Sequence, residues 1–255
     1  MPLPRILILR APGTNCDAET AFAFERAGGR ADVVHLNRWL EAPALAQDFQ
    51  ILCLPGGFSY GDDLGSGRIF ANQLRHHLAE SLAAFRDAGK LILGICNGFQ
   101  ILIKSGLLGS DDAAGPGATL TWNDSGRFID RWVNLRVAGD RCAFLRGIER
   151  MFLPIAHAEG QFVGRDDKVL DRLDRAGQLA LRYAAASDGG DAPFNPNGAA
   201  RDVAGMCDAS GRVFGLMPHP ERFIDRTHHP QWTRLPPFDE GDGLQLFRNA
   251  VQYFL

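Results

Sequence analysis

One segment of this 255-residue chain places a cysteine where a nucleophile could form. Residues 91–104 read L-I-L-G-I-C-N-G-F-Q-I-L-I-K, a buried-strand pattern that passes through G-x-C-x-G into a helical apolar pattern. Gly94 and Gly98 fit a sharp turn in which the strand and the helix nearly touch. A thiol at the N-terminus of that helix is favoured as the thiolate. The segment therefore predicts Cys96 as a nucleophile, and a buried structural cysteine is the alternative.

A thiol nucleophile needs a general base, and one of the seven histidines has a suitable setting. His219 lies in M-P-H-P-E-R, directly after a predicted strand, and Glu221 follows two residues later. In extended backbone, side chains two residues apart point the same way, so we expect Glu221 to hold the His219 imidazole in the productive tautomer. An H-x-E pattern alone is weak, because a surface histidine beside a glutamate is common.

A glycine-rich loop supplies the third element of the predicted chemistry. Residues 54–63 read L-P-G-G-F-S-Y-G-D-D and follow another predicted buried strand. The consecutive glycines Gly56 and Gly57 could turn backbone N–H groups toward a developing oxyanion, together with the N–H of Asn97. A phosphate-binding loop is the competing interpretation, but the chain has neither G-x-G-x-x-G nor G-x-x-x-x-G-K-[ST].

The remaining cysteines and histidines carry weaker patterns. Cys16, in G-T-N-C-D, has no pair of flanking glycines, so we expect it to serve packing or helix entry. The sequence predicts no metal site, because no cluster with ligand spacing accompanies the pair His228 and His229. The other thiols lie within or beside apolar strand patterns and are expected in the core: Cys53, Cys142 and Cys207.

Composition narrows the classes of partner. The chain has 27 Lys and Arg against 30 Asp and Glu, a formal charge of −3. Nucleic acids and anionic membranes are bound mainly through excess positive charge, so neither is expected as the main partner. No apolar run approaches the roughly 20 residues that cross a bilayer, and the start M-P-L-P-R lacks a secretory pattern. The expected compartment is the cytoplasm.

Short apolar strands alternate with helical segments along the first part of the chain, which predicts an α/β fold with a mostly parallel sheet covered by helices on both faces. The later segments predict antiparallel additions to the same core rather than a second domain, so residues 1–255 are expected to form one domain. Residues 185–200, rich in Gly, Asn, Pro and Ala, predict an irregular loop. The predicted strands are residues 5–10, 31–36, 50–54, 90–95, 127–137, 151–155, 203–207 and 212–217, and the predicted helices are residues 17–27, 66–88 and 243–254.

Taken together, G-I-C-N-G-F-Q, P-G-G-F-S-Y-G-D and P-H-P-E-R resemble the class I (triad) glutamine amidotransferases, and among them the PurQ-type glutaminase subunits of phosphoribosylformylglycinamidine synthase. The resemblance extends over nearly the whole chain, through G-T-N-C-D, A-H-A-E-G, N-P-N-G and D-G-L-Q-L-F-R-N-A. The chain differs at Ala158, where the family often has glycine, which puts the turn beside His157 in question. Residues 226–242 are longer than in compact members and are similar to the glutaminase domain of the large fused synthases.

The resemblance implies a doubly wound, flavodoxin-like fold and a role for each matching residue. Cys96 would be the nucleophile, His219 the general base and acid, and Glu221 its orienting partner. Oxyanion N–H groups would come from Gly57 and Asn97. A further residue, Gln100, would lie close to the bound glutamine.

The implied activity is hydrolysis of glutamine to glutamate and ammonia through a cysteine thioester. A PurL-type synthetase would use the ammonia to make formylglycinamidine ribonucleotide in de novo purine biosynthesis. The resemblance leaves open whether a small PurS-type accessory subunit takes part. No cofactor is expected in this chain, and ATP and Mg²⁺ are expected on the synthetase.

Two other interpretations stay open at this point. One is a different Cys-His-Glu glutamine amidotransferase or a γ-glutamyl hydrolase, which would share the G-x-C-x-G turn but not G-F-S-Y-G-D or N-P-N-G. The other is a binding or assembly module with an inactive site. That second interpretation predicts loss of the nucleophile or the base, and both are present here.

Overall fold

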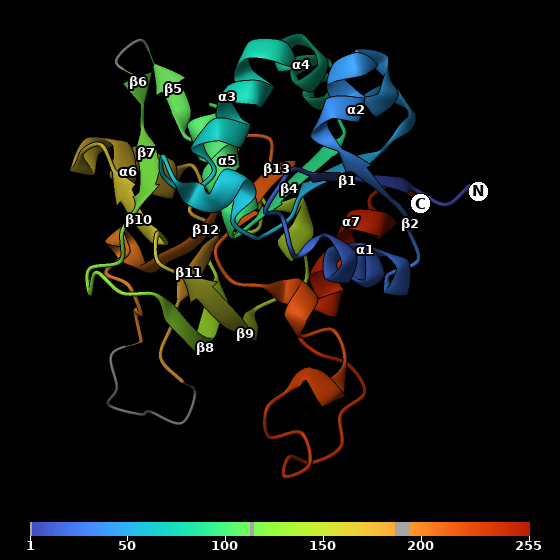
Figure 1. Ribbon diagram of the computed structural model, residues 1–255. Helices are drawn as coiled ribbons and strands as arrows, with labels where there is room; N and C mark the ends of the chain where they lie inside the picture. The colour runs from blue at the N-terminus through green and yellow to red at the C-terminus, as the bar shows by residue number, and fades with distance from the viewer. Residues whose placement is uncertain (1, 113–114, 187–193) are drawn as a thin grey trace.

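A large mixed β-sheet forms the centre of the molecule in the computed structural model, which describes residues 2–112, 115–186 and 194–255 (Figure 1). Within these residues nine strands share this sheet in the order β2-β1-β3-β4-β13-β12-β11-β8-β9. Their bounds are β1 (Arg5–Arg10), β2 (Arg30–His35), β3 (Ile51–Leu54), β4 (Leu91–Ile95), β8 (Ile129–Val137), β9 (Arg150–His157), β11 (Leu181–Tyr183), β12 (Val203–Cys207) and β13 (Val213–Leu216).

The sheet has a parallel half and an antiparallel half, as the sequence predicts. Strands β2, β1, β3, β4 and β13 are parallel to one another, whereas β12, β11, β8 and β9 continue the sheet with antiparallel pairs. The parallel strands at the centre are buried on both faces, because every residue of β3 and β4 is buried. That burial explains why their sequences are continuous apolar runs without polar alternation.

Helices cover both faces of the parallel half (Figure 1). Helices α1 and α7 pack together on one face, where the rings of Phe24 and Phe247 meet edge to face at 4.9 Å. Helices α3 and α5 lie on the other face, with α4 following α3. The bounds are α1 (Asp17–Arg26), α2 (Leu36–Glu41), α3 (Arg68–His77), α4 (Ala79–Asp87), α5 (Asn97–Lys104), α6 (Asp167–Arg175) and α7 (Leu244–Gln252).

The prediction of one long helix over residues 66–88 is wrong. The chain forms α3 and α4 instead, separated at Leu78, whose φ of −124° and ψ of 12° are not helical. Helix α3 also begins two residues late, at Arg68, because Gly67 before it adopts a left-handed φ of 72°. The spacing of apolar residues does not indicate the break, because Leu78 is itself buried and continues the apolar stripe of both helices.

Two small antiparallel sheets and several short helical turns complete the described structure. Strand β7 (Ala118–Thr121) pairs with β10 (Gln161–Gly164), and β5 (Ser110–Asp112) pairs with β6 (Gly115–Pro116). The predicted loop at 185–200 lies partly outside the described residues. Of its described residues, 185–186 and 194–199 form neither helix nor strand, whereas Ala200 already belongs to a 3₁₀ turn. The 3₁₀ turns are η1 (Pro43–Asp48), η2 (Ser59–Asp62), η3 (Ala143–Leu145), η4 (Ala200–Asp202), η5 (Pro220–Arg222) and η6 (Arg226–His228).

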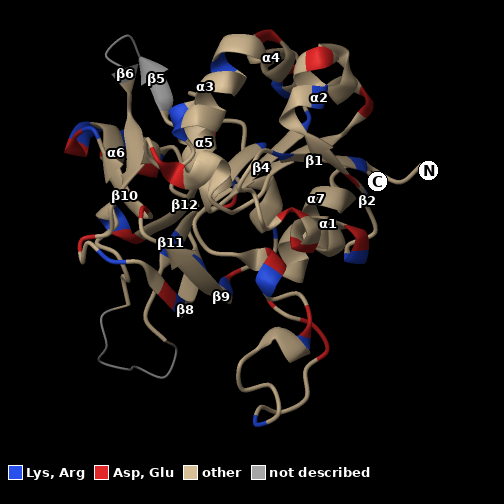
Figure 2. Cartoon of the chain, viewed as in Figure 1, with Lys and Arg blue, Asp and Glu red and all other residues tan. Residues whose placement is uncertain are grey.

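Charged residues are interspersed over the surface. In the view of Figure 2, blue basic and red acidic segments alternate over the helices and the sheet edges. None of the described helices combines the length and the apolar character that crossing a bilayer requires.

Candidate active site

The carboxyl ends of four parallel strands bring the predicted chemistry to one edge of the sheet. Strands β1, β3, β4 and β13 are neighbours in parallel orientation, so the segments that follow them start at the same edge. Those segments carry Cys16, Gly56, Cys96 and His219 respectively. Residues that are far apart in the sequence therefore converge.

Cys96 occupies the sharp turn between β4 and α5. Its φ of 51° and ψ of −104° lie outside the regions that L-residues usually adopt. Such a conformation costs on the order of 1–3 kcal/mol and needs support from its surroundings. The Cys96 N–H donates to the Leu216 carbonyl at 2.7 Å, which ties the turn to β13, and the residue is 6% exposed. The structure thus has the strand-to-helix elbow that the sequence predicts.

Two glycines permit this elbow because backbones approach closely on both sides of it. A Cβ atom on Gly98 would lie 1.8 Å from the Leu54 carbonyl oxygen. A Cβ atom on Gly94 would lie 2.6 Å from the Gly98 carbonyl oxygen. Both distances are far shorter than any real contact, so the G-x-C-x-G spacing follows from the packing of β3, β4 and α5.

His219 and Glu221 form a buried hydrogen-bonded pair. The distance between His219 Nδ1 and Glu221 Oε1 is 2.6 Å, and the two side chains are 2% and 0% exposed. The His219 N–H donates to the Pro154 carbonyl at 2.9 Å, which anchors the segment to β9. The contact was predicted, but the reason given for it is wrong, because Glu221 lies in the 3₁₀ turn η5 and not in extended backbone.

The surroundings of His219 favour its protonated form. Burial by itself lowers the pKa of the imidazole, but the Glu221 carboxylate and the nearby Cys96 raise it, with a net pKa well above the ordinary value. The Nε2 atom is buried and has no hydrogen-bond partner among the described residues. With Nδ1 directed at Glu221, this leaves Nε2 as the nitrogen that can exchange a proton with a reacting group.

The two glycines of the glycine-rich loop, Gly56 and Gly57, have different roles at the site. Gly57 lines the cleft beside Cys96, has a φ of +137°, and its N–H finds no acceptor among the described residues. Gly56 supplies space instead: a Cβ there would lie 2.8 Å from His219 Cε1 and 3.1 Å from Cys16 Sγ. The first N–H of α5, that of Asn97, also has no partner within its helix.

The cleft at Cys96 is narrow. Its volume is about 30 Å³, which leaves room for about one or two water molecules. Gln100 lines it and is held there by two side-chain hydrogen bonds, one donated to the Glu159 carbonyl and one accepted from Asn97 Nδ2 at 3.0 Å. The cleft is lined by Gly57, Phe58, Asp62, Ser66, Cys96, Gln100, Ala156, His157, Ala158 and Glu159.

A larger cavity of about 580 Å³ adjoins this cleft, but it contains none of Cys96, His219 and Glu221. It lies between α3, α5 and β7 and shares Glu159 with the cleft. Within the described part of the chain, the small cleft and not the large cavity is therefore where a cysteine could act.

The turn at Ala158 needs no glycine at that position. Ala158 is not among the described residues with positive φ, so alanine fits an ordinary backbone conformation. The position in this turn that has no room for a side chain is Gly160, because a Cβ there would lie 2.2 Å from His157 Cε1. Burial and the nearby His219 lower the pKa of His157 to about 4, so this ring is neutral, and its Nδ1 lies 3.1 Å from Asn123 Oδ1.

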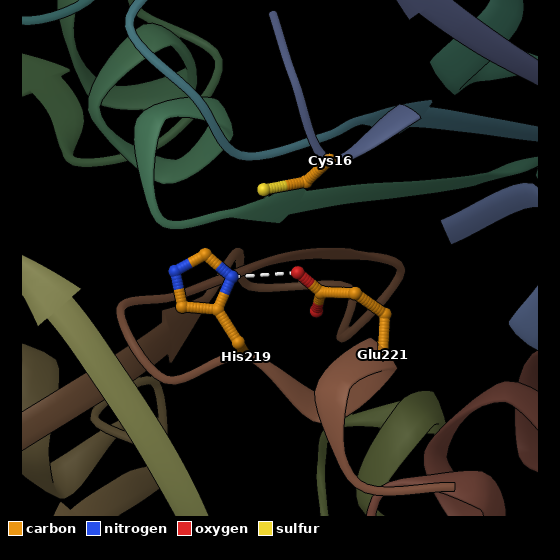
Figure 3. A group of neighbouring side chains, drawn as sticks. All are labelled: Cys16, His219 and Glu221. Carbon is orange, nitrogen blue, oxygen red and sulfur yellow. Dashed lines mark hydrogen bonds and ion pairs between the residues drawn. The ribbon is translucent and has the colours of Figure 1, made fainter. Parts of the chain in front are cut away.

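Sequence reasoning missed the closeness of Cys16 to the triad. Cys16 precedes the first residue of α1 and is 1% exposed, in keeping with its expected role at the helix entry. Its thiol sulfur, a ring nitrogen of His219 and a carboxylate oxygen of Glu221 also lie within 4.8 Å of one another. Figure 3 shows the Cys16 side chain beside the pair of His219 and Glu221. A signal existed, since Cys16 follows a parallel strand, but the order of strands cannot be obtained from one sequence.

The remaining candidates lie away from the cleft. Cys53, Cys142 and Cys207 are buried in the core, as predicted. His229 packs against aromatic rings, with Trp132 at 5.3 Å and Phe152 at 5.7 Å between ring centroids. It belongs to the base of the 226–242 segment, which projects from the body in Figure 1.

Comparison with known proteins places these features in a family. Residues 3–254 match the family described as the CobB/CobQ-like glutamine amidotransferase domain. A relative from Dehalococcoides mccartyi, phosphoribosylformylglycinamidine synthase subunit PurQ, is 47% identical over 98% of this chain and 97% of its own length. The subunit of the same name from Methanococcus maripaludis is 41% identical over 99% of this chain and 98% of its own. A chain in the structure of PurLQS from Thermotoga maritima aligns over the full length of both chains with a TM-score of 0.75 and 34% identity.

Proposed function

Because the chain belongs to the glutamine amidotransferases, in the family of the PurQ subunits of phosphoribosylformylglycinamidine synthase, we propose that Cys96, His219 and Glu221 are its catalytic triad. The chain is the glutaminase subunit of that synthase and hydrolyses glutamine to glutamate and ammonia. One observation carries the assignment of residues: Cys96, strained on the elbow between β4 and α5, is close enough to the buried His219 to raise its pKa, and both residues contact the Cβ position of Gly56. The Nδ1 atom of the same ring is 2.6 Å from Glu221 Oε1.

The reaction begins with attack of the Cys96 sulfur on the carbon of the glutamine side-chain carboxamide. His219 takes the thiol proton at Nε2 and returns it to the leaving nitrogen, so that ammonia departs and a γ-glutamyl thioester remains on Cys96. A water molecule then attacks the thioester while Nε2 accepts its proton, and glutamate leaves. Glu221 holds the ring in the tautomer that presents Nε2 and stabilises the imidazolium that forms in each step.

Backbone N–H groups stabilise the oxyanion of both tetrahedral intermediates in this proposal. The donors are Gly57, whose N–H has no other acceptor among the described residues, and Asn97 at the N-terminus of α5. Gly56 serves the same loop by leaving space for the His219 ring. Gln100 lines the position of the bound glutamine and holds the loop of Glu159 through its amide.

The ammonia goes to a synthetase subunit of the PurL type, which makes formylglycinamidine ribonucleotide in purine biosynthesis. The similar structure from Thermotoga maritima is described as PurLQS, which supports this partnership and the participation of a PurS-type subunit. We assign ATP and Mg²⁺ to the synthetase and no cofactor or catalytic metal to this chain. Residues 1–255 act as one domain, since the parallel and antiparallel strands share one sheet. The cytoplasm is the proposed compartment, which suits five cysteines that are all unpaired.

The proposal is tested by measuring glutamate release and amidation of formylglycinamide ribonucleotide with purified components. The chain together with a PurL-type synthetase, ATP and Mg²⁺ should couple the two products, and omission of the chain should leave amidation dependent on added ammonia. Glutamine-dependent amidation that proceeds equally well without this chain would contradict the proposed function.

A further inference from the structure

Cys16 provides a second thiol beside the triad, and the catalytic steps do not use it. Its main-chain N–H donates to the Gly56 carbonyl at 3.3 Å, and its sulfur accepts from Arg222 Nη2 at 3.2 Å. Arg222 is itself held by Glu19, with 2.9 Å between Nε and Oε1. The thiol is thus fixed in place by contacts to Gly56 and Arg222. Burial raises the pKa of this thiol above its ordinary value, while the charges of His219 and Arg222 act in the opposite direction, so a bound cation is needed to hold it as a thiolate.

Unpartnered buried polar atoms lie in the same group. Glu221 Oε2 is buried and has no hydrogen-bond partner among the described residues, although its carboxylate is 0% exposed. Isolated buried carboxylate oxygens are costly unless a proton donor or a cation satisfies them. A thiolate sulfur, an imidazole nitrogen and a carboxylate oxygen are also the three ligand types that zinc takes in proteins.

We propose that Cys16, His219 and Glu221 bind a thiophilic divalent cation of the Zn²⁺ type, and that this binding switches the glutaminase off. Two ligand atoms of a tetrahedral zinc site lie roughly 3.3–3.8 Å apart, given its bond lengths. The three donor atoms already lie within 4.8 Å of one another. The 2.6 Å contact between Nδ1 and Oε1 has to widen by about 1 Å, so small side-chain movements complete the site.

The metal binds His219 through Nδ1, because Nδ1 is the ring nitrogen that faces Glu221 and both residues must contribute a ligand atom. Binding to the imidazolium form of His219 releases two protons to solvent, one from the Cys16 thiol and one from His219 Nδ1, and a water molecule takes the fourth position. The remaining ring proton is then fixed on Nε2. Nε2 can no longer accept a proton from Cys96, so thioester formation stops. This inhibition rests on the proposed role of His219, whereas metal binding itself does not.

Metal binding is tested first with Co²⁺ on the full chain carrying Cys96→Ala, which removes the other thiol near His219. We expect a near-ultraviolet thiolate-to-cobalt band and the visible bands of tetrahedral Co²⁺. Adding Cys16→Ser or Cys16→Ala should remove the thiolate band, while Cys142→Ser, at a buried thiol next to Cys207, should leave it unchanged. Circular dichroism identifies any variant that fails to fold. A thiolate band that survives both Cys16 substitutions in folded protein overturns the site.

Inhibition is tested by Zn²⁺ titration of glutamate release from the chain docked on its synthetase, with each variant compared with its own metal-free rate. Cys16→Ser should raise the half-inhibiting Zn²⁺ concentration at least about tenfold, and a chelator should restore the unsubstituted chain. Equal Zn²⁺ sensitivity of the two proteins overturns the switch. Absence of glutaminase activity in every protein would instead contradict the proposed function, and the Co²⁺ spectra would still decide the metal site.

Discussion

Two thiols lie near His219, and their backbone settings predict different consequences of substitution. Cys96 occupies the strained elbow, whereas Cys16 precedes α1 in ordinary backbone with a φ of −99°. Cys96→Ala should abolish glutamine-dependent amidation by the assembled synthase but leave ammonia-dependent amidation intact, because only ammonia generation needs the nucleophile. Cys16→Ser is the matched substitution and should keep most of both activities. Equal loss of the two activities in Cys96→Ala would contradict the role of Cys96.

The charge of Glu221 should set the alkaline limit of activity. Burial lowers the pKa of His219, but Glu221 and Cys96 raise it to a net value above the ordinary one, so the imidazolium that protonates ammonia persists to higher pH. Activity should therefore fall as the pH rises through this raised pKa. Glu221→Gln removes the carboxylate charge, so the falling limb of the kcat/KM profile should move to lower pH.

His219→Ala is compared with Glu221→Gln, because it removes the imidazole ring itself. It should lower turnover on the order of 10²- to 10⁴-fold. Glu221→Gln should cost less, since its amide oxygen can still accept from Nδ1. An alkaline limb at the same pH in Glu221→Gln and the unsubstituted chain would contradict the electrostatic role of Glu221.

Local patterns explain which site residues could be predicted from the sequence. Cys96 and the pair of His219 and Glu221 are recognisable because their signals lie within a few neighbouring residues. Cys16 reaches the site because β1 lies beside β3 in the sheet, and Glu159 reaches it from the turn that follows β9. No local spacing encodes either placement. Their position depends on how β1 and β9 are placed in the sheet.

At the scale of elements, the close approach of β3 and α5 predicts a stability effect. Gly98→Ala would put a Cβ 1.8 Å from the Leu54 carbonyl oxygen, and rigid backbone stands on both sides of this contact. We expect the free energy of unfolding to fall by about 3 kcal/mol or more, which lowers the Tm by roughly 6–12 °C for a chain of this size.

Gly89→Ala is the control for the glycine substitution itself. Gly89 has a left-handed φ of +74° and open space around its Cβ position, so alanine there should cost about 1–2 kcal/mol. Thermal unfolding followed by circular dichroism compares the two variants. If the Tm of Gly98→Ala equals or exceeds that of Gly89→Ala, α5 can move away from β3 without loss of stability, and the expected steric penalty is wrong.

The elements themselves were predictable where burial is complete and unpredictable where apolar spacing continues through a break. Strands β3 and β4 are continuous apolar runs because they are covered on both faces. Leu74, Leu78 and Leu82 repeat every four residues and are all buried, which is the pattern of a single helix. The chain nevertheless turns at Leu78, whose φ of −124° and ψ of 12° are not helical.

At the scale of the whole molecule, the cleft at Cys96 is too small for the substrate. Its volume of about 30 Å³ admits about one or two water molecules, whereas glutamine must place a carboxamide beside the sulfur. The lining loops that surround Cys96 must therefore move apart before glutamine can bind. Among them, the loop of Gly57 contains a residue that tolerates both signs of φ. Its movement has to release the bridge between Gly57 and Thr14 and the hydrogen bond that the Phe58 N–H donates to the Gly13 carbonyl.

We therefore expect the isolated chain to be a poor glutaminase that becomes active when it is docked on its synthetase with substrate or nucleotide bound. The synthetase would act by favouring the open, competent state of the cleft, and a shift of about 3 kcal/mol would raise turnover on the order of a hundredfold. Steady-state glutamate release is measured for the chain alone, then with the synthetase, then with the synthetase and its ligands. A rise confined to the third condition would assign the opening to the ligand-bound synthetase, because the chain and its triad are the same in all three. Full turnover by the chain alone would mean that the cleft opens without a partner, and the gating proposal would then be wrong.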